Sequence, residues 1–250
     1  MATVPARRIK PSRGSLSAAA GSHDGLSPSD GVIFDRTCTD CPRLAKFLAD
    51  ARDKHPDYYN APVAPFGDPN ARLILVGLAP GFHGANATGR PFTGDHAGLI
   101  LYRTLHRFGF ANKPESTHRG DGFKLIDCRI TNSVKCVPPE NKPTPAEIHT
   151  CNRYLTAELD REPAGRVLLA LGTIAHNAAL RALALKPSSY PFAHAGEHAL
   201  PNGHILLDSY HCSRYNTQTR RLTEEMFANV FVRATELLER GDWRTADGGR

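Results

Sequence analysis

The feature that most constrains the fold is an alternation of four short apolar runs with helix-like segments. The runs are rich in branched residues and cover 73–78, 125–134, 167–171 and 205–208. Segments with helical spacing of apolar residues lie around 96–108, 144–160, 173–185 and 222–239. This order predicts an α/β fold in which a parallel sheet is covered by helices on both faces. A chain of 250 residues can build one such core as a single domain.

The two ends of the chain have a different composition. Residues 1–30 are rich in Ala, Gly, Ser, Pro and Arg and have almost no apolar periodicity, so we expect a disordered arm. We expect one folded domain over 31–243 and a flexible tail over 244–250. No apolar stretch approaches the ~20 residues that span a bilayer, and the N-terminus lacks the apolar core of a secretory signal. These features predict a cytoplasmic protein and not a membrane protein.

The charge of the chain is weakly informative. Lys and Arg number 31 against 25 Asp and Glu, which gives a net charge of +6. A pI near 9.1 is as typical of an ordinary basic soluble protein as of one that binds a polyanion.

The segment after the first apolar run, GLAPGFHGANATGRPFTGD, is a shaped loop with five Gly and two Pro in nineteen residues. It matches neither GxGxxG nor GxxxxGK[ST], so it does not indicate a nucleotide cofactor. His83, Asn86, Phe92 and Asp95 lie in it. Each of them could serve only a turn or the core. Their occurrence together after a buried strand, where ligands bind to open α/β sheets, favours a functional site.

The six cysteines give a second pattern. Without an export signal, they favour metal or cluster ligation over a disulfide framework. Four have a suggestive arrangement, in which a CxxC pair precedes a helix, one cysteine closes the second strand and one begins a helical segment: Cys38, Cys41, Cys136 and Cys151. Zinc and a [4Fe-4S] cluster both accept four thiolates, and spacing does not choose between them. We expect Cys128 to be a core residue, and Cys212 could be mistaken for a nucleophile.

The third pattern is the polar segment SYHCSRYNTQTRRLT, which follows the last apolar run. It is well equipped to contact phosphates and base edges, through His211, Ser213, Arg214, Asn216, Gln218 and Thr219. A helix N-cap at Asn216 or Thr217 is the plainer alternative, and the two roles are compatible.

Together these motifs resemble the family 5 uracil-DNA glycosylases, the iron-sulfur type of bacteria and archaea. The resemblance rests on the loop after the first run, on KCVPPENKPTP, on CTDC and on the polar segment, and spans about 35 to 240. It implies a three-layer α/β/α sandwich with a short central parallel sheet. It also implies a [4Fe-4S] cluster on Cys38, Cys41, Cys136 and Cys151.

The implied activity is hydrolysis of the N-glycosidic bond of a flipped-out deaminated base, with DNA containing uracil or bases such as hypoxanthine as the partner. We expect a monomer of the bacterial cytoplasm, at the nucleoid. Two positions depart from the pattern. Cys212 stands where family 4 tends to have Pro, and Asn132 resembles the base-reading Asn of family 4, whereas family 5 often has a small residue there. We therefore expect uracil to be the best substrate and hypoxanthine a weaker one.

The chemistry of this reaction suggests roles for individual residues. The sugar acquires oxocarbenium character while uracil leaves as an anion. Asp95 could orient the attacking water and stabilise the sugar cation, and His211 could donate to the leaving base. Phe92 offers a stacking face for the base. Asn141, in the loop after Cys136, is a second polar candidate that ranks below Asp95.

Further residues are expected around the base and the DNA. Gly77, Ala79 and Gly81 would keep the loop slim enough to hold the base against backbone groups. His83 would either point into the base pocket or cap the loop. Phosphates could be neutralised by basic residues near these loops, namely Lys135, Lys142, Arg214, Arg220 and Arg221.

Two other classes of protein remain as alternatives. One is a non-catalytic, metal-stabilised nucleic-acid-binding module. Asp95 argues against it, because a carboxylate beside bound DNA repels phosphate. The other is a redox or radical enzyme, against which stands the lack of a CxxxCxxC triplet and of a flavin or dinucleotide loop.

Overall fold

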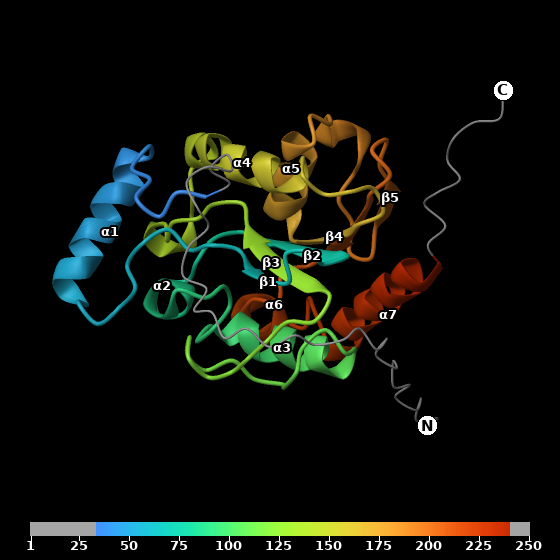
Figure 1. Ribbon diagram of the computed structural model, residues 1–250, viewed down its shortest axis with the longest axis horizontal. Coiled ribbons are helices and arrows are strands. Elements are labelled where there is room, and N and C mark those ends of the chain that lie inside the picture. Colours follow the sequence, from blue (N-terminus) through green and yellow to red (C-terminus); the bar gives the residue numbers. More distant parts are fainter. Residues whose placement is uncertain (1–33, 241–250) are drawn as a thin grey trace, which may run out of the picture.

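The computed structural model describes residues 34–240, so the expected arm over 1–30 and the expected tail over 244–250 lie outside the described residues. A six-stranded sheet in the order β1-β3-β2-β4-β6-β5 forms the centre of the molecule (Figure 1). Its four inner strands are parallel to one another and are β3 (Cys128–Asn132), β2 (Leu73–Gly77), β4 (Val167–Leu171) and β6 (Ile205–Ser209). All four were predicted from the apolar runs. β2 and β3 are shorter than their runs, β4 coincides with its run, and β6 ends one residue beyond its run.

The two edges of the sheet differ from the prediction of a purely parallel sheet. β1 (Phe66–Gly67) and β5 (Glu197–Ala199) pair antiparallel with β3 and β6. These strands have two and three residues and carry no apolar run, so periodicity gives no sign of them. Short edge strands of this kind leave little unpaired backbone at the border of a sheet.

Helices cover both faces of the sheet, which confirms the three-layer α/β/α architecture (Figure 1). α4 (Pro145–Leu159) and α5 (Thr173–Ala182) lie on one face, and α3 (His96–Arg107) and α7 (Glu224–Arg240) lie on the other. Alternate residues of β2 feed the two cores, with Ile74 packed toward α4 and α5 and Leu75 toward α3 and α7. Both faces of each parallel strand are buried, which explains why the strands read as continuous apolar runs.

A further helix, α1 (Pro42–Lys54), lies beside the sheet at the end of α4 (Figure 1). Leu44 and Leu48 bury its apolar face in a small core with Val134 and Tyr154. The short elements are α2 (Ala85–Thr88), α6 (Arg214–Gln218) and two 3-10 turns, η1 (Pro139–Asn141) and η2 (Pro187–Ser189).

The boundary of α4 corrects one expectation. Cys151 was expected to begin this helix, but α4 begins at Pro145 and Cys151 lies in its middle. Thr144 is the N-cap, and its hydroxyl accepts from Glu147 N–H at 3.2 Å while Glu147 Oε2 accepts from Thr144 N–H at 2.7 Å. This capping box fixes the start of the helix six residues earlier than the cysteine.

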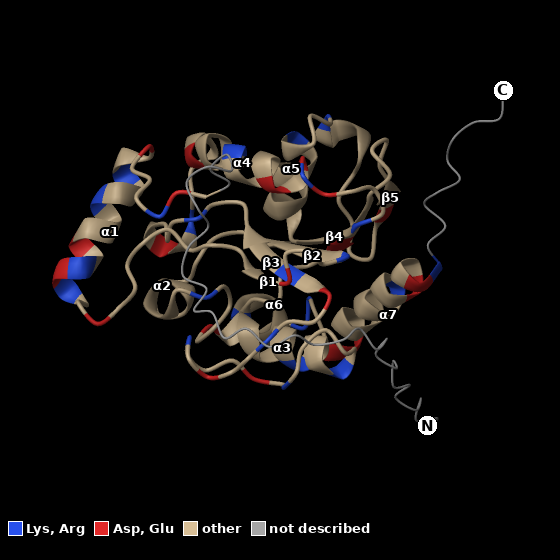
Figure 2. Cartoon of the chain, viewed as in Figure 1, with Lys and Arg blue, Asp and Glu red and all other residues tan. Residues whose placement is uncertain are grey.

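Charged residues of both signs are mixed along the outer helices, as Figure 2 shows for α1 and α7. On α1, for example, Lys46 pairs with Asp50 at 2.8 Å. Among the described residues, no helix combines the length and the apolar character needed to cross a membrane.

Candidate functional site

The sheet topology brings the loops after β2, β3, β4 and β6 to one edge. β2 is flanked by β3 and β4, and Gly77 at its end lies in register with Asn132 at the end of β3. Because parallel strands point the same way, the chemistry-bearing segments predicted after each strand meet at this edge, which is where open α/β sheets bind ligands.

Gly77, Asn132 and Phe92 form the innermost part of the site. A Cβ atom on Gly77 would lie 2.4 Å from Asn132 Oδ1 and 3.0 Å from Phe92 Cζ, so only glycine fits between them. The Phe92 ring is buried, and its backbone has φ of 58°, in the left-handed region that bulky residues avoid. The Phe92 backbone also packs closely on Gly98, where a Cβ atom would meet the Phe92 carbonyl oxygen at 1.9 Å. Packing at these two glycines therefore fixes where the aromatic ring lies.

Asp95 occupies the N-cap position of α3, but its side chain makes no cap hydrogen bond within the described chain. The carboxylate turns back to the loop after β2, where Ala85 N–H lies 3.4 Å from Oδ2. Burial raises the pKa of this carboxyl from its ordinary value to about 6, and the Ala85 N–H lowers it slightly in opposition. The group is thus ionised at neutral pH but poorly solvated, which suits a carboxylate that stabilises a transient cation.

His211 follows β6, and its ring lies next to that of Phe92. The two rings are nearly parallel, with an interplanar angle of 27° and centroids 6.2 Å apart. Asn216 Nδ2 donates to the His211 carbonyl at 2.8 Å, which holds the backbone of this residue. Burial lowers the pKa of the imidazole to about 4, because desolvation disfavours the cation. The ring is therefore neutral at physiological pH and can donate one N–H.

The loop between β4 and α5 packs against His211 at Gly172. Gly172 has φ of 97°, and a Cβ there would make an ordinary contact with His211 Cβ at 3.5 Å. The position thus requires glycine because of its backbone conformation and not because of a clash.

Some predicted residues lie elsewhere. His83 is exposed, and its Nδ1 lies 2.9 Å from Tyr58 OH in a cluster with the rings of His55 and Phe82. Asn141 is exposed at the end of η1, with φ of 57°. Within the described residues, no hydrogen bond or ring contact links either of them to Asp95 or His211. The alternative of a base-pocket role for His83 is thus not supported by its position.

Ala79, which was predicted to line the base pocket, is half-buried. It packs against the small core that contains Leu44 and Leu48 of α1, and Phe82 and Cys41 pack against the same core. Gly81, in contrast, lies at the carboxylate, because a Cβ there would be 2.3 Å from Asp95 Oδ1.

The polar segment after His211 forms the short helix α6. Its N-cap is Ser213, whose hydroxyl accepts from Asn216 N–H at 3.3 Å, so the expectation of a cap at Asn216 or Thr217 is wrong. Asn216 is instead engaged with the His211 carbonyl. Three other residues assigned to nucleic acid are exposed on or next to this helix, namely Arg214, Gln218 and Thr219. Exposed Lys142 lies apart from them, 3.4 Å from Glu140.

Lys135 corrects another expectation. It was grouped with the residues that neutralise phosphates, but its side chain is buried. The ammonium group bonds to Glu158 Oε1 at 2.6 Å and to Thr131 Oγ1 at 2.5 Å. Lys135 therefore forms an internal ion pair with Glu158 that holds the segment after β3 to α4, and its charge is not available to DNA.

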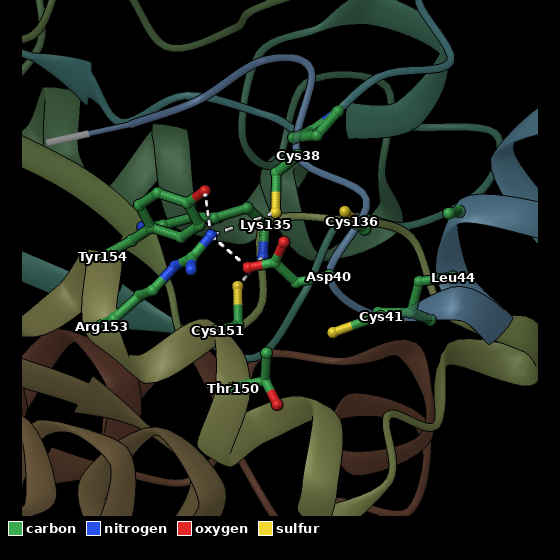
Figure 3. A pocket seen from close by; sticks show the side chains of 12 residues that line it. Cys38, Asp40, Cys41, Leu44, Lys135, Cys136, Thr150, Cys151, Arg153 and Tyr154 are labelled. Atoms are coloured by element: carbon green, nitrogen blue, oxygen red, sulfur yellow. Dashed lines mark hydrogen bonds and ion pairs between the residues drawn. The ribbon is translucent and has the colours of Figure 1, made fainter. Parts of the chain in front are cut away.

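The four cysteines of the predicted metal site line one pocket between α1, α4 and the loop after β3 (Figure 3). Around them lie Leu44, the Lys135 backbone, Asp40 and Arg153. Lys135 N–H donates to Cys151 Sγ at 3.2 Å, and Arg153 Nη2 donates to Cys38 Sγ at 3.6 Å. Arg153 also pairs with Asp40 and lies over the Tyr154 ring.

Comparison with known proteins agrees with this geometry. The family model described as the uracil DNA glycosylase superfamily matches residues 64–234, which span the loops that carry Asp95 and His211. The chain belongs to the uracil-DNA glycosylase superfamily. It is 47% identical to a Type-5 uracil-DNA glycosylase of Thermus thermophilus over 205 residues, covering 80% of this chain and 93% of the relative. The Type-5 enzyme of Pyrobaculum aerophilum is 41% identical over 201 residues, covering 79% of this chain and 87% of the relative.

Similarity to the neighbouring type is more limited. A Type-4 uracil-DNA glycosylase of Thermotoga maritima is 36% identical over 95 residues, which are 38% of this chain and 42% of that relative. The likeness to Type-5 proteins thus extends over most of the chain, whereas the likeness to Type 4 covers less than half.

The donor set of the cysteine pocket can be tested against the iron-sulfur cluster that this branch of the superfamily implies. Burial raises the pKa of the Cys41 thiol to about 11, with further increases from the facing Cys151, Glu147 and Cys38, and burial raises the pKa of Cys136 as well. Four thiols that face each other in an apolar pocket need a cation to become thiolates together.

The spacing of these sulfurs bears on which cation fits. Thiolates around one zinc ion, each ~2.3 Å from the metal, stand about 3.8 Å apart. In the part of the chain that the structure describes, no three cysteine sulfurs lie within 4.8 Å of one another. The sulfurs are thus not gathered as closely as around one zinc ion. Hydrogen bonds to two of the sulfurs are also typical of cluster thiolates, so the donor set fits an iron-sulfur cluster.

The other two cysteines belong to the core. Cys128 on β3 is buried, as expected for a core residue. Cys212 is also fully buried, and burial raises the pKa of its thiol to about 12, so it is not a nucleophile at neutral pH.

Sequence reasoning missed Gly84, which is as close to the carboxylate as Gly81. A Cβ on Gly84 would lie 1.9 Å from Asp95 Oδ1. The signal was present as a pair of glycines three positions apart, but nothing in the sequence says which distant side chain packs on them.

Proposed function

We propose that this chain hydrolyses the N-glycosidic bond between uracil and deoxyribose in DNA and leaves an abasic site. The observation that carries the proposal is the arrangement of a desolvated carboxylate, Asp95, and a neutral imidazole, His211, around the buried ring of Phe92. Two relatives that are similar over about four fifths of this chain are named Type-5 uracil-DNA glycosylases. A non-catalytic binding module gives no reason for a partly buried carboxylate at this edge.

The negative group acts on the sugar. As the bond breaks, the deoxyribose becomes oxocarbenium-like, and an ionised Asp95 stabilises this charge more strongly in a poorly solvated site than in water. The same carboxylate can orient the attacking water and take its proton.

The neutral group acts on the base. Uracil leaves as an anion, and a neutral His211 N–H donates to its O2 without the cost of holding an imidazolium in a buried site. Phe92 stacks on the extruded base, which contributes ~1–3 kcal/mol per base in comparable contacts. Gly77 keeps the space beside Phe92 and Asn132 open, and Gly81 leaves room for the Asp95 carboxylate.

DNA is the partner that this activity requires. We propose that Arg214, Gln218 and Thr219 contact it from the exposed side of α6, beside His211, and that Lys142 contacts a phosphate at the loop after β3. Asn216 supports the same surface by holding the His211 carbonyl. Asn141 remains a second polar candidate that ranks below Asp95. The monomeric state, the cytoplasmic location and activity on hypoxanthine stay predictions.

The test of the activity is a cleavage assay on duplexes that carry uracil, hypoxanthine or xanthine. We expect the wild type to cleave uracil best. Asp95→Asn keeps the shape of the side chain and removes its charge, so single-turnover cleavage should fall by at least ~100-fold while binding to uracil DNA is nearly unchanged. Near-normal cleavage by this variant would move the role to Asn141 or another group.

A second variant separates the two roles. His211→Ala should also slow the chemical step, because the leaving base loses its donor. An unchanged rate would mean that backbone donors alone stabilise the leaving group.

We also propose that Cys38, Cys41, Cys136 and Cys151 hold a [4Fe-4S] cluster. Base hydrolysis needs no electrons, so the cluster would act as a staple that ties the segment before α1 to α4 and to the loop after β3. The purified protein should be yellow-brown with about four irons per chain. Cys128→Ala should leave colour and iron unchanged, whereas a colourless wild type with one zinc would refute the cluster.

A further inference from the structure

A second group of metal-ligating side chains lies away from both the cysteine pocket and the Asp95 site. His176 on α5, His198 on β5 and Asp208 on β6 each offer one ligand atom, and these atoms lie within 4.8 Å of one another. His176 and Asp208 are fully buried, and the side chain of His198 is 16% exposed. Asp208 is a fully buried charged residue that follows three apolar residues in β6, which is a costly placement unless the charge is compensated.

Two atoms of this group have no hydrogen-bond partner among the described residues. His198 Nε2 and Asp208 Oδ2 are buried and make no hydrogen bond among the described residues. They face each other at 3.7 Å, which is too long for a hydrogen bond between nitrogen and oxygen. Two ligands of one tetrahedral ion, each ~2.1 Å from it, stand about 3.4 Å apart. The observed separation is close to that of two atoms bound to the same metal.

His176 meets acceptors at both ring nitrogens. Its Nε2 lies 2.8 Å from the Tyr190 carbonyl oxygen, and its Nδ1 lies 2.8 Å from Asp208 Oδ1. A carbonyl only accepts, so the proton of a neutral ring belongs on Nε2, and the Nδ1 lone pair then points toward a carboxylate. An Nε2–H bonded to a backbone carbonyl is also the common arrangement of a histidine that binds metal through its other nitrogen.

We propose that His176 Nδ1, His198 Nε2 and the Asp208 carboxylate form a binding site for a divalent transition metal of the zinc class. Two imidazoles and one carboxylate are a ligand set that zinc accepts, with a fourth position left for water on the partly exposed side of His198. The ion would satisfy His198 Nε2 and Asp208 Oδ2, the two buried atoms of this group that now lack hydrogen-bond partners. It would also tie the edge strand β5 to α5 and β6.

The alternative to a metal ion is a proton, which would make His176 an imidazolium beside Asp208. The metal-bound and the protonated state differ in what the protein takes up from solution. A metal site saturates with one ion per chain, whereas a protonated pair takes up none.

The experiment titrates the purified, iron-loaded protein with zinc chloride in equilibrium dialysis and measures zinc and iron per chain by elemental analysis. The test variant is His198→Gln, which removes the ligand on the partly exposed edge strand. The matched control is His106→Gln, which changes an exposed histidine on the opposite face, on α3. We expect wild type and control to bind one zinc more than His198→Gln at the same iron content, with affinity at this site reduced at least ~100-fold in the variant. The cysteines are the same in all three proteins, so any zinc that they hold cancels in the difference between wild type and His198→Gln.

Equal zinc uptake by the wild type and His198→Gln would overturn the proposal. If His198→Gln does not fold, cobalt(II) chloride added to the wild type decides the question. Ligand-field bands without a thiolate charge-transfer band would support the nitrogen and oxygen site. An absence of such bands, or bands of thiolate type only, would refute it.

Discussion

The carboxylate of Asp95 rests directly against the backbone of Gly84. A Cβ atom at Gly84 would lie 1.9 Å from Asp95 Oδ1 and 2.0 Å from Cγ, and a Cβ at Gly81 would lie 2.3 Å from the same oxygen. The carboxylate therefore occupies space that exists only because two residues of the loop have no side chain. This explains why Asp95, although it stands at the N-cap of α3, turns toward the loop instead of capping the helix.

The first prediction follows from this contact. Gly84→Ala should push the carboxylate away from its position and lower single-turnover cleavage of uracil DNA by ~100-fold, since a displacement near 1 Å at a catalytic group costs about that much. The clash is with a side-chain end, so we expect the variant to fold. Gly120→Ala is the matched control, because its Cβ would meet only the His118 ring at 3.7 Å. A wild-type rate in Gly84→Ala would show that Asp95 is not held by this glycine.

The second prediction concerns pH. The pKa of Asp95 is raised to about 6 by burial, so the active carboxylate is present above this pH and is lost as the pH falls through it. The pKa of His211 is lowered to about 4, so His211 stays neutral over the same range. A plot of kcat/KM against pH, which reports the free enzyme, should therefore rise with a midpoint near 6. The residual activity of Asp95→Asn should not show this rise with pH. If the rise persists in the variant, it reports the titration of another group.

The third prediction concerns the buried pair of Lys135 and Glu158. Removing one partner of such a pair leaves an uncompensated charge and costs ~3–5 kcal/mol. Lys135→Met should therefore lower the free energy of unfolding by about this amount in urea titrations. The control is Arg103→Met, which breaks an exposed ion pair with Glu115 and should cost at most ~1 kcal/mol.

A double variant completes this test. Lys135→Met with Glu158→Gln removes both charges and should recover a large part of the loss. If Lys135→Met is as stable as the exposed control, the internal ion pair does not stabilise the contact of β3 with α4.

Prediction from sequence worked where the signal is local. The inner strands are buried on both faces, so Leu73 and Val167 each begin an apolar run that can be read directly. The edge strand β5 has no such run, because its three residues alternate between exposed and half-buried positions. Its place in the sheet depends on pairing with β6, which no local pattern contains.

Side-chain environments were harder to predict, because they depend on distant partners. Lys135 looked like a phosphate ligand until Glu158, on another element, was placed beside it at 2.6 Å. His83 lies in the loop after β2, but its ring faces Tyr58, which comes from the segment after α1. The four cysteines, by contrast, were grouped from their arrangement along the chain and then through resemblance to a known family, and the structure brings them to one pocket.

Asn132 is the residue on which substrate choice should depend. It lies buried at the end of β3, and its Oδ1 makes no hydrogen bond among the described residues. A buried acceptor without a partner is costly, and a ligand that donates to it recovers that cost. The unpaired Oδ1 therefore does not support the alternative in which the Asn132 side chain bonds only to neighbouring backbone. Gly77 keeps the space in front of this oxygen open, since a Cβ there would lie 2.4 Å from it.

The last prediction uses this acceptor to separate substrates. The amide of Asn132 can accept from uracil N3–H and donate to O4 at once, whereas cytosine presents a bare N3 and an amine and leaves both groups unpaired. Asn132→Ala should therefore lose most uracil cleavage, while the roomier pocket keeps the weaker activity on hypoxanthine, which backbone groups can read. The measurement is single-turnover cleavage of matched uracil and hypoxanthine duplexes by the variant and the wild type. Equal loss on both substrates would mean that Asn132 supports the site but does not read the base.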